Sequence, residues 1–183
     1  MILGFTGLKR CGKDTAASYI LEKYGAEQVM LADPIKRALM TMFGFTWEQV
    51  NGEGYDREQV IPEYGVSIRH MLQTLGTEWG RMLINPDIWV RLQAERLEHD
   101  KLYVMSDVRF ENEAELCRQN GILIHVRNLK QSEVVDHHKS EDGVEFAQGD
   151  IILNNKMDGL RQFHNDIEAV LTHLREDRGW KQI

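Results

Sequence analysis

The 183-residue sequence contains few cysteines, few prolines and no long apolar run. Its two cysteines, Cys11 and Cys117, are too few for a disulfide framework, so we expect a reducing, cytoplasmic environment. No apolar run approaches the roughly 18 residues that span a bilayer, and the N-terminus lacks the layout of a signal peptide. These absences argue against secreted, disulfide-stabilised and membrane-spanning proteins.

An excess of positive charge is also missing. The 22 basic residues minus the 29 acidic residues give a net charge of −7, which argues against polymeric nucleic acid as a partner. Small anionic ligands remain compatible with this charge, because a local basic pocket can lie in an acidic protein. The length and the hydrophobic content of 42% suit one domain with a sizeable core.

Short apolar segments alternate with helical periodicities along the chain. The expected strands are 2–6, 27–31, 101–106, 122–126 and 150–154. The expected helices are 13–24, 34–43, a short one after Thr46, 67–84, 86–99, 111–120 and 160–174. Residues 51–65 are rich in turn formers and predict an irregular loop, and Trp79 lies on an apolar stripe that predicts a core position. The alternation favours an α/β fold with a parallel sheet covered by helices.

The spacing Gly7-x4-Gly12-Lys13 falls between the first strand and the first helix. Backbone N–H groups of such a loop, together with the helix N-terminus, cradle phosphate oxygens, and Lys13 would reach the terminal phosphates. Lys9 and Arg10 add positive charge. A plain strand–helix turn with a surface lysine is the alternative, but the agreement of spacing with context favours a phosphate loop.

Asp14 stands where such loops usually place Ser or Thr. A carboxylate is a hard oxygen ligand that suits Mg²⁺, and Thr15 offers a hydroxyl for the same role. Asp107 ends an apolar strand, as an acid that organises Mg²⁺ does. The alternatives are a helix N-terminal acid favoured by the dipole for Asp14, and a structural salt bridge for Asp107 and Arg109.

Nine segments occur in the order found in bacteriophage deoxynucleoside monophosphate kinases: GLKRCGKDTAA, LADPIKRAL, YDRE, SIRHMLQTLGTEWG, DIWV, SDVRFENEAE, HVR, HKSE and DIILNN. The chain therefore resembles this family from residue 3 to about 174. The resemblance implies a single P-loop kinase domain over 1–183, with a five-stranded parallel sheet flanked by helices, a helical substrate-binding insertion at 33–99 and a lid at 127–149. Two departures are Cys11, where a small serine is expected, and a short linker between YDRE and SIRH.

The same resemblance implies that ATP donates a phosphate to a deoxynucleoside monophosphate with Mg²⁺ as cofactor, in the host cytoplasm if a phage encodes the chain. It leaves the oligomeric state open, a homodimer included. The expected catalytic residues are Lys13, Asp107, Arg109 and Arg127. The expected ATP and metal contacts are Gly7, Lys9, Arg10, Gly12, Lys13, Asp14, Thr15, Asp107, Asn154 and Asn155. The expected acceptor contacts are Asp33, Lys36, Arg37, Asp56, Arg69, Gln73, Thr77, Trp89, Arg109, Lys139 and Glu141.

Several of these residues have a simpler interpretation. Arg69, Gln73 and Thr77 recur at intervals of four and would form a stripe on one helix face, which is a solvated surface unless the acceptor binds there. Cys11 lies in an electropositive loop, which favours a reactive thiol, but space filling is the preferred interpretation. The adjacent His137 and His138 lack a third ligand at metal spacing.

Two other functions compete with nucleotide phosphorylation. Another P-loop small-molecule kinase would act on a metabolite such as phosphomevalonate or dephospho-CoA, but the stretch SIRHMLQTLGTEWG favours a nucleotide acceptor. A nucleotide-binding switch protein would hydrolyse ATP slowly and need no acceptor. ATP turnover that depends on an added monophosphate would exclude the switch protein.

Overall fold

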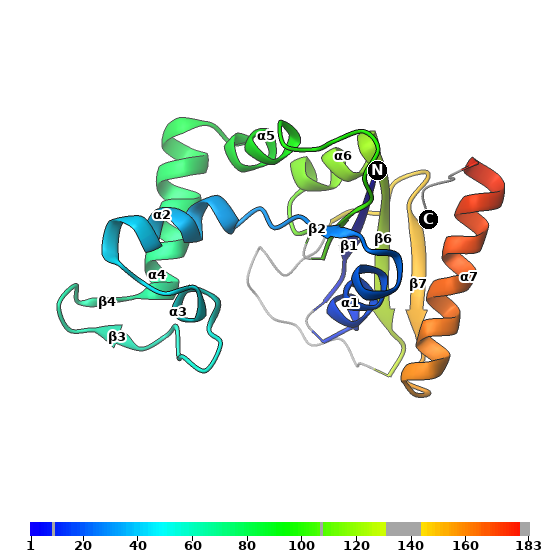
Figure 1. Ribbon diagram of the computed structural model, residues 1–183, viewed down its shortest axis with the longest axis horizontal. Coiled ribbons are helices and arrows are strands. Elements are labelled where there is room, and N and C mark those ends of the chain that lie inside the picture. Colours follow the sequence, from blue (N-terminus) through cyan, green and yellow to red (C-terminus); the bar gives the residue numbers. More distant parts are fainter. Residues whose placement is uncertain (9, 107, 131–143, 180–183) are drawn as a thin grey trace. The chain divides into compact units, whose positions relative to one another are not determined.

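The computed structural model describes residues 1–8, 10–106, 108–130 and 144–179. The chain divides into two compact units, the first formed by residues 1–30 and 97–183 and the second by residues 31–96. Figure 1 shows the helices and strands of both units. Among the described residues, no helix is both long and apolar enough to cross a membrane.

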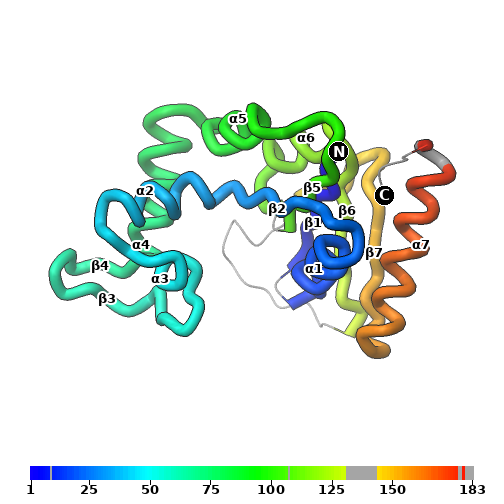
Figure 2. Tube along the Cα trace, viewed as in Figure 1, coloured from blue at the N-terminus to red at the C-terminus, as the bar shows by residue number. Residues whose placement is uncertain are grey.

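The first unit is built on a five-stranded sheet, which confirms the predicted architecture. Its strands are β1 (Ile2–Thr6), β2 (Glu27–Gln28), β5 (Tyr103–Met105), β6 (Gly121–Asn128) and β7 (Ile151–Asn155). Their order is β2-β5-β1-β6-β7, and every neighbouring pair is parallel. The first strand of the chain therefore lies in the middle of the sheet (Figure 2). The strand predicted over 27–31 is shorter than expected, and the one predicted over 122–126 is longer.

Helices cover both faces of this sheet. The helices α1 (Lys13–Tyr24) and α7 (Leu160–Arg178) share one apolar cluster with Leu3 and Phe5 of β1 (Figure 1). Helix α6 (Glu111–Asn120) packs on the other face, where its Cys117 lies against Gly4. A Cβ atom on Gly4 would lie 2.4 Å from Cys117 Sγ, so this close approach of helix and strand requires glycine.

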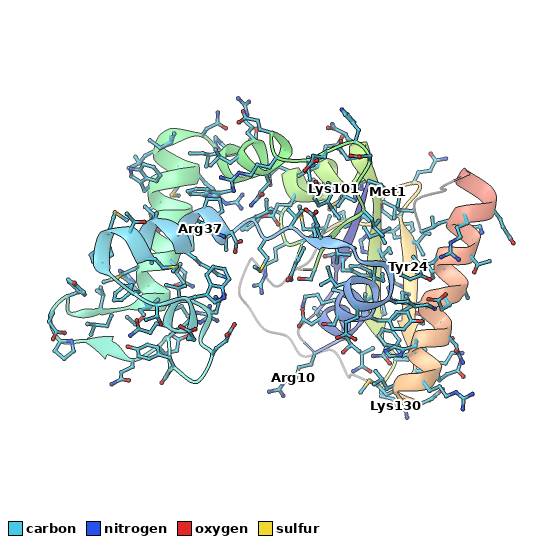
Figure 3. All side chains as sticks on the ribbon, viewed as in Figure 1. Met1, Arg10, Tyr24, Arg37, Lys101 and Lys130 are labelled. Carbon is cyan, nitrogen blue, oxygen red and sulfur yellow. The ribbon has the colours of Figure 1, made fainter. Side chains whose placement is uncertain are left out.

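A polar contact joins α1 to α7 beside this core. The carboxylate of Glu168 on α7 accepts hydrogen bonds from Tyr19 Oη at 2.9 Å and Tyr24 Oη at 2.8 Å. It also pairs with Lys23 Nζ at 2.9 Å, and Tyr24 can be located in Figure 3. The helix that follows the phosphate loop is thus fixed by polar as well as apolar contacts.

The second unit consists of helices and one small β-hairpin. Its elements are α2 (Asp33–Phe43), α3 (Trp47–Asn51), β3 (Val60–Ile61), β4 (Val66–Ser67), α4 (Ile68–Gln73), a π-helix η1 (Thr74–Ile84) and α5 (Ile88–Ala94). Leu39, Val50 and Ile68 form its core. The predicted capping box is confirmed, because Thr46 Oγ1 accepts from Gln49 N and Gln49 Oε1 accepts from Thr46 N.

Three predictions for this unit were wrong in detail. Residues 51–65 are not irregular throughout, because Val60 and Ile61 begin a hairpin with Val66 and Ser67. The helix expected over 67–84 changes from α to π geometry at Thr74. Trp79, expected in the core, is 45% exposed.

Candidate active site

The phosphate loop follows β1 directly and needs its two glycines. Gly7 has φ +143°, and a Cβ there would lie 2.4 Å from the backbone oxygen of Val126. Gly12 has φ +109° and caps the N-terminus of α1, and a Cβ there would lie 2.6 Å from Asn155 Nδ2. Both positions combine a backbone conformation that favours glycine with a neighbour that leaves no room for a side chain.

Asn155, at the end of β7, holds this loop in place. Its Nδ2 donates to the backbone oxygen of Cys11 at 3.0 Å, and its Oδ1 accepts from Met157 N at 3.0 Å. The side chain is buried. Asn155, predicted to contact ATP, therefore supports the backbone of the loop, whereas Asn154, its predicted companion, is exposed.

The charged groups of the loop differ in their exposure. Lys13 is buried at the first position of α1, whereas Arg10 extends into open space in Figure 3 with φ +65°. Asp14 and Thr15 are exposed on the first turn of α1, and neither side chain hydrogen-bonds to another group in the described part of the chain. Lys9 lies outside the described residues. Two hard oxygen donors beside the loop fit a magnesium ion.

Cys11 is buried within the loop, and its thiol is not activated. Burial raises the pKa of the Cys11 thiol, and the backbone hydrogen bond and the charge of Lys13 lower it less. This supports the space-filling interpretation. Burial likewise raises the pKa of Cys117, to about 12.

The carboxyl end of β5 continues into the segment that carries Arg109. Asp107, predicted as the metal-organising acid, lies outside the described residues. The adjacent Val108 donates its N–H to the backbone oxygen of Phe5 at 3.0 Å, and Arg109 donates its N–H to Glu113 Oε2 at 2.8 Å. Glu113 is a buried carboxylate that the sequence analysis did not single out. Because it also accepts from Phe110 N at 3.2 Å, it fixes the backbone on both sides of the Arg109 side chain.

Thr6 is a second residue that the sequence analysis missed. It ends β1 immediately before Gly7, and its Oγ1 is buried without a hydrogen-bond partner in the described part of the chain. A hydroxyl residue at the last position of the strand before a phosphate loop was the available signal.

Arg127, predicted to belong to a lid, lies in β6 and is exposed, opposite Asn154 of β7. Lys139 and Glu141, the other lid residues of the predicted site, lie outside the described residues.

A buried ionic network holds residues 144–150 to this part of the unit. The Asp150 carboxylate accepts hydrogen bonds from Arg118 Nε at 3.0 Å and Arg118 Nη2 at 2.9 Å. It also accepts a hydrogen bond from Ala147 N at 2.9 Å and lies 3.0 Å from the ring nitrogen Nε2 of His125. Burial raises the pKa of the Asp150 carboxyl, but the hydrogen bonds from Arg118, Ala147 and His125 outweigh burial and hold it below its ordinary value. The network is a structural anchor that no local sequence pattern indicated.

In the second unit, Lys36 and Arg37 converge on one indole ring. Lys36 Nζ lies 5.6 Å and Arg37 Cζ 5.9 Å from the centroid of the Trp47 ring, and Arg37 is marked in Figure 3. Lys36 Nζ also donates to Asn51 Oδ1 at 2.6 Å. Burial lowers the pKa of Lys36; among the nearby charges, Asp33 opposes this shift and Arg57 adds to it.

The other acceptor residues predicted in this unit have different surroundings. Asp33 has a buried Oδ1 atom without a partner among the described residues. Asp56 Oδ1 accepts from Glu58 N at 3.0 Å and closes a turn. Arg69, Gln73 and Thr77 are all exposed, as a stripe requires, but Arg69 Nε pairs with Glu58 at 3.0 Å.

Trp89 is the predicted acceptor residue that the structure moves into the core. Its indole is only 5% exposed, its Nε1 donates to the backbone oxygen of Gly76 at 2.8 Å, and its ring packs against Gly80. With its polar atom satisfied and its face covered, Trp89 is a packing residue in place of a substrate contact.

Within 1–8, 10–106, 108–130 and 144–179, no three His, Cys, Asp or Glu side chains gather as a metal site would require. Mg²⁺ usually keeps several waters and binds through one or two protein oxygens together with substrate phosphates, a pattern that the oxygen donors of Asp14 and Thr15 fit.

A glycine-bracketed phosphate loop between a central parallel strand and a helix, in a sheet of order β2-β5-β1-β6-β7, defines a P-loop kinase fold. A solved structure of the protein TT1252 from Thermus thermophilus has a similar fold, with a TM-score of 0.51 and 18% sequence identity, covering 95% of this chain and 97% of that one. At this identity the likeness concerns the fold alone.

The sequence comparisons identify the family. The family described as deoxynucleotide monophosphate kinase matches residues 1–64 and 62–167. The deoxynucleotide monophosphate kinase of Escherichia phage RB69 is 28% identical over 244 aligned positions, covering 93% of this chain and 99% of the relative. The enzyme of the same name from Enterobacteria phage T4 is 27% identical, covering 94% and 99%. This chain belongs to the deoxynucleotide monophosphate kinase family.

The two matched segments meet at residues 62–64, in the turn between β3 and β4. The alignment with the RB69 relative spans 244 positions, more than the 183 residues of this chain, so that relative carries additional residues. The short linker noticed in the sequence thus coincides with the hairpin of the second unit.

Proposed function

We propose that this chain transfers the γ-phosphate of ATP to a deoxynucleoside 5′-monophosphate, giving ADP and the diphosphate. The observation that carries the proposal is the phosphate loop, in which Gly7 and Gly12 leave no room for side chains and Lys13 begins the following helix. Membership of the deoxynucleotide monophosphate kinase family supports the acceptor. Because the named relatives come from phages, we place the reaction in the host cytoplasm.

The donor side of the reaction belongs to the first unit. Backbone N–H groups of the loop and Lys13 would bind the phosphates of ATP, and Arg109 and Arg127 would stabilise the charge that develops during transfer. Asp14 or Thr15, with Asp107, would hold Mg²⁺, which supplies neutralising charge between the β- and γ-phosphates.

The acceptor side belongs to the second unit. Lys36 and Arg37 are basic, and the ring of Trp47 holds both in one place. Arg69 and Gln73 would contact the acceptor from α4. A monophosphate dianion needs such positive charge, since the two polyanionic substrates otherwise repel each other.

The test is an ADP-release assay with each of the deoxy- and ribonucleoside monophosphates in turn. We expect ADP release to depend on an added deoxynucleoside monophosphate, and Lys13→Ala to reduce that rate by at least 100-fold while the circular dichroism spectrum is unchanged. Lys23→Ala is a matched control, because Lys23 lies on the same helix and pairs with Glu168. ADP release without any acceptor dependence, or near-normal turnover of a folded Lys13→Ala variant, would refute the proposal.

A further inference from the structure

The second unit contains a pair of cations at the C-terminal end of α3 whose donors are mostly unused. Lys36 donates to Asn51 Oδ1, and Arg57 Nη1 donates to the backbone oxygen of Val50 at 3.4 Å. An ammonium has three N–H donors and a guanidinium has five, so the two contacts leave six of eight donors unused in the described part of the chain. Neither cation is within ion-pair distance of a carboxylate among the described residues.

The fold holds both side chains toward the same place. Asn51 is fixed because its Nδ2 donates to the backbone oxygen of Trp47 at 2.9 Å, and it therefore fixes Lys36. Arg57 crosses Gly52, where a Cβ atom would lie 2.9 Å from Arg57 Nε. Gly52 has φ +77° and ends α3, so the residue that stops this helix also makes room for the guanidinium.

The energetics of this arrangement favour an anion. Lys36 is partly buried, and the positive charge of Arg57 disfavours its charged form in the absence of a ligand. The carboxylates of Asp33 and Glu53 compensate only partly, because neither reaches an ion-pair distance. A phosphate monoester would accept several of the unused N–H groups and relieve the repulsion between the cations.

We infer that Arg57 and Lys36 together bind the 5′-phosphate of the acceptor nucleotide and that Asn51 positions Lys36 for this contact. Arg69, one of the residues expected at the acceptor site, is paired with Glu58. The inference rests on the proposed function for the identity of the ligand. It adds the residue on which binding of the monophosphate depends.

The kinetic test compares Arg57→Ala with Arg91→Ala, an equal change of charge at an exposed position on α5 of the same unit. We expect Arg57→Ala to raise the KM of the deoxynucleoside monophosphate about 10- to 100-fold, the value of a charge-assisted hydrogen bond. The KM of ATP should stay within twofold, and Arg57→Lys should recover part of the loss. Asn51→Asp keeps the size of the side chain but adds a negative charge beside Lys36, so it should also raise the acceptor KM and leave that of ATP unchanged.

A binding measurement separates this inference from the proposed function. Deoxyribose 5-phosphate, added to the full chain, should shift the backbone amide NMR signals of Asn51 and Gly52, and Arg57→Ala should abolish the shifts. If no nucleoside monophosphate supports ADP release but these shifts occur, the proposed function fails and the phosphate site stands. If the kinase activity is present but Arg57→Ala leaves the acceptor KM unchanged, the inference is overturned, and a raised KM in Arg69→Ala would assign the phosphate to the stripe on α4.

Discussion

Replacing Asp150 by asparagine should strongly destabilise the first unit. The Asp150 side chain is 1% exposed and accepts hydrogen bonds from Arg118, His125 and Ala147. Asparagine has nearly the same shape but no charge, and its amide group presents N–H donors where Asp150 only accepts. Arg118 would then keep a largely buried positive charge, and its remaining ion-pair partner among the described residues would be the exposed Glu111.

Removal of one partner from a buried ion pair costs about 3–5 kcal/mol. For a chain of this size, that cost corresponds to a fall in Tm of roughly 6–20 °C. Urea denaturation, followed by circular dichroism at 222 nm, measures the change in the free energy of unfolding. Fluorescence in a Trp180→Phe background, which leaves Trp47, Trp79 and Trp89 of the second unit, reports whether the two units unfold together. Glu111→Gln is the control, because its carboxylate is 62% exposed and its loss should cost less than about 1 kcal/mol.

The destabilisation caused by Asp150→Asn should also depend on pH. The pKa of Asp150 in the folded protein lies below its ordinary value, so the carboxylate contributes stability that is fully present above the unfolded pKa of about 4. This contribution is lost as the pH falls through the folded pKa. The difference in unfolding free energy between the parent and Asp150→Asn should therefore be constant above about pH 5 and shrink below pH 4. A loss under 1 kcal/mol at pH 7, or a difference that stays constant down to pH 3, would refute this reasoning.

Three further predictions concern the phosphate loop. Gly7→Ala should raise the KM of ATP at least 10-fold, because its Cβ would meet a backbone oxygen of β6 at 2.4 Å, whereas Gly25→Ala, whose Cβ meets nothing within 4 Å, should cost only about 1 kcal/mol of stability; equal ATP affinities would count against the loop geometry. The Cys11 thiol should react with iodoacetamide at pH 8 more slowly than a free cysteine, because burial raises its pKa, and faster alkylation would contradict this. Asp14→Asn should raise the Mg²⁺ concentration for half-maximal activity; an unmoved curve would leave Asp14 as a helix-terminal acid, and a larger shift in Thr15→Val would assign the ligand to Thr15.

The features that the sequence predicted correctly depend on neighbours along the chain. The segment from Ile2 to Lys13 contains a buried strand, the loop glycines Gly7 and Gly12, and a helix start within twelve residues, so its local pattern suffices to predict the phosphate loop. Thr46 and Ser67 cap their helices through groups three residues away, which is also local.

The features that the sequence did not predict depend on residues far apart along the chain. Asn155 supports the loop through a contact with Cys11 across 144 positions. Asp150 meets Arg118 across 32 positions and His125 across 25. Composition and periodicity carry no information about such pairs. An asparagine at the end of a strand therefore predicts a ligand contact as readily as a structural one, and only the fold distinguishes between them.

The π-helix shows why a correct periodicity gave a wrong core position for Trp79. Gly76 and Gly80 are buried, the Trp89 ring lies against Gly80, and Trp89 Nε1 takes the Gly76 carbonyl as its acceptor. The Asn85 N–H bonds to Gly80 five residues back, as π geometry requires.

A π-helix has roughly 4.4 residues per turn instead of 3.6, so each residue after Thr74 turns about 18° less than an α-helix would. Over the five residues from Thr74 to Trp79 this difference adds up to about 90°, which turns Trp79 a quarter of a turn away from the apolar stripe and leaves its side chain 45% exposed. At Met82 and Leu83 the accumulated difference in rotation approaches half a turn, which accounts for their exposure of 73% and 76%. The prediction of a core position for Trp79 failed because it assumed the period of an α-helix throughout, whereas the packing of Trp89 against Gly76 and Gly80 accompanies the period of a π-helix.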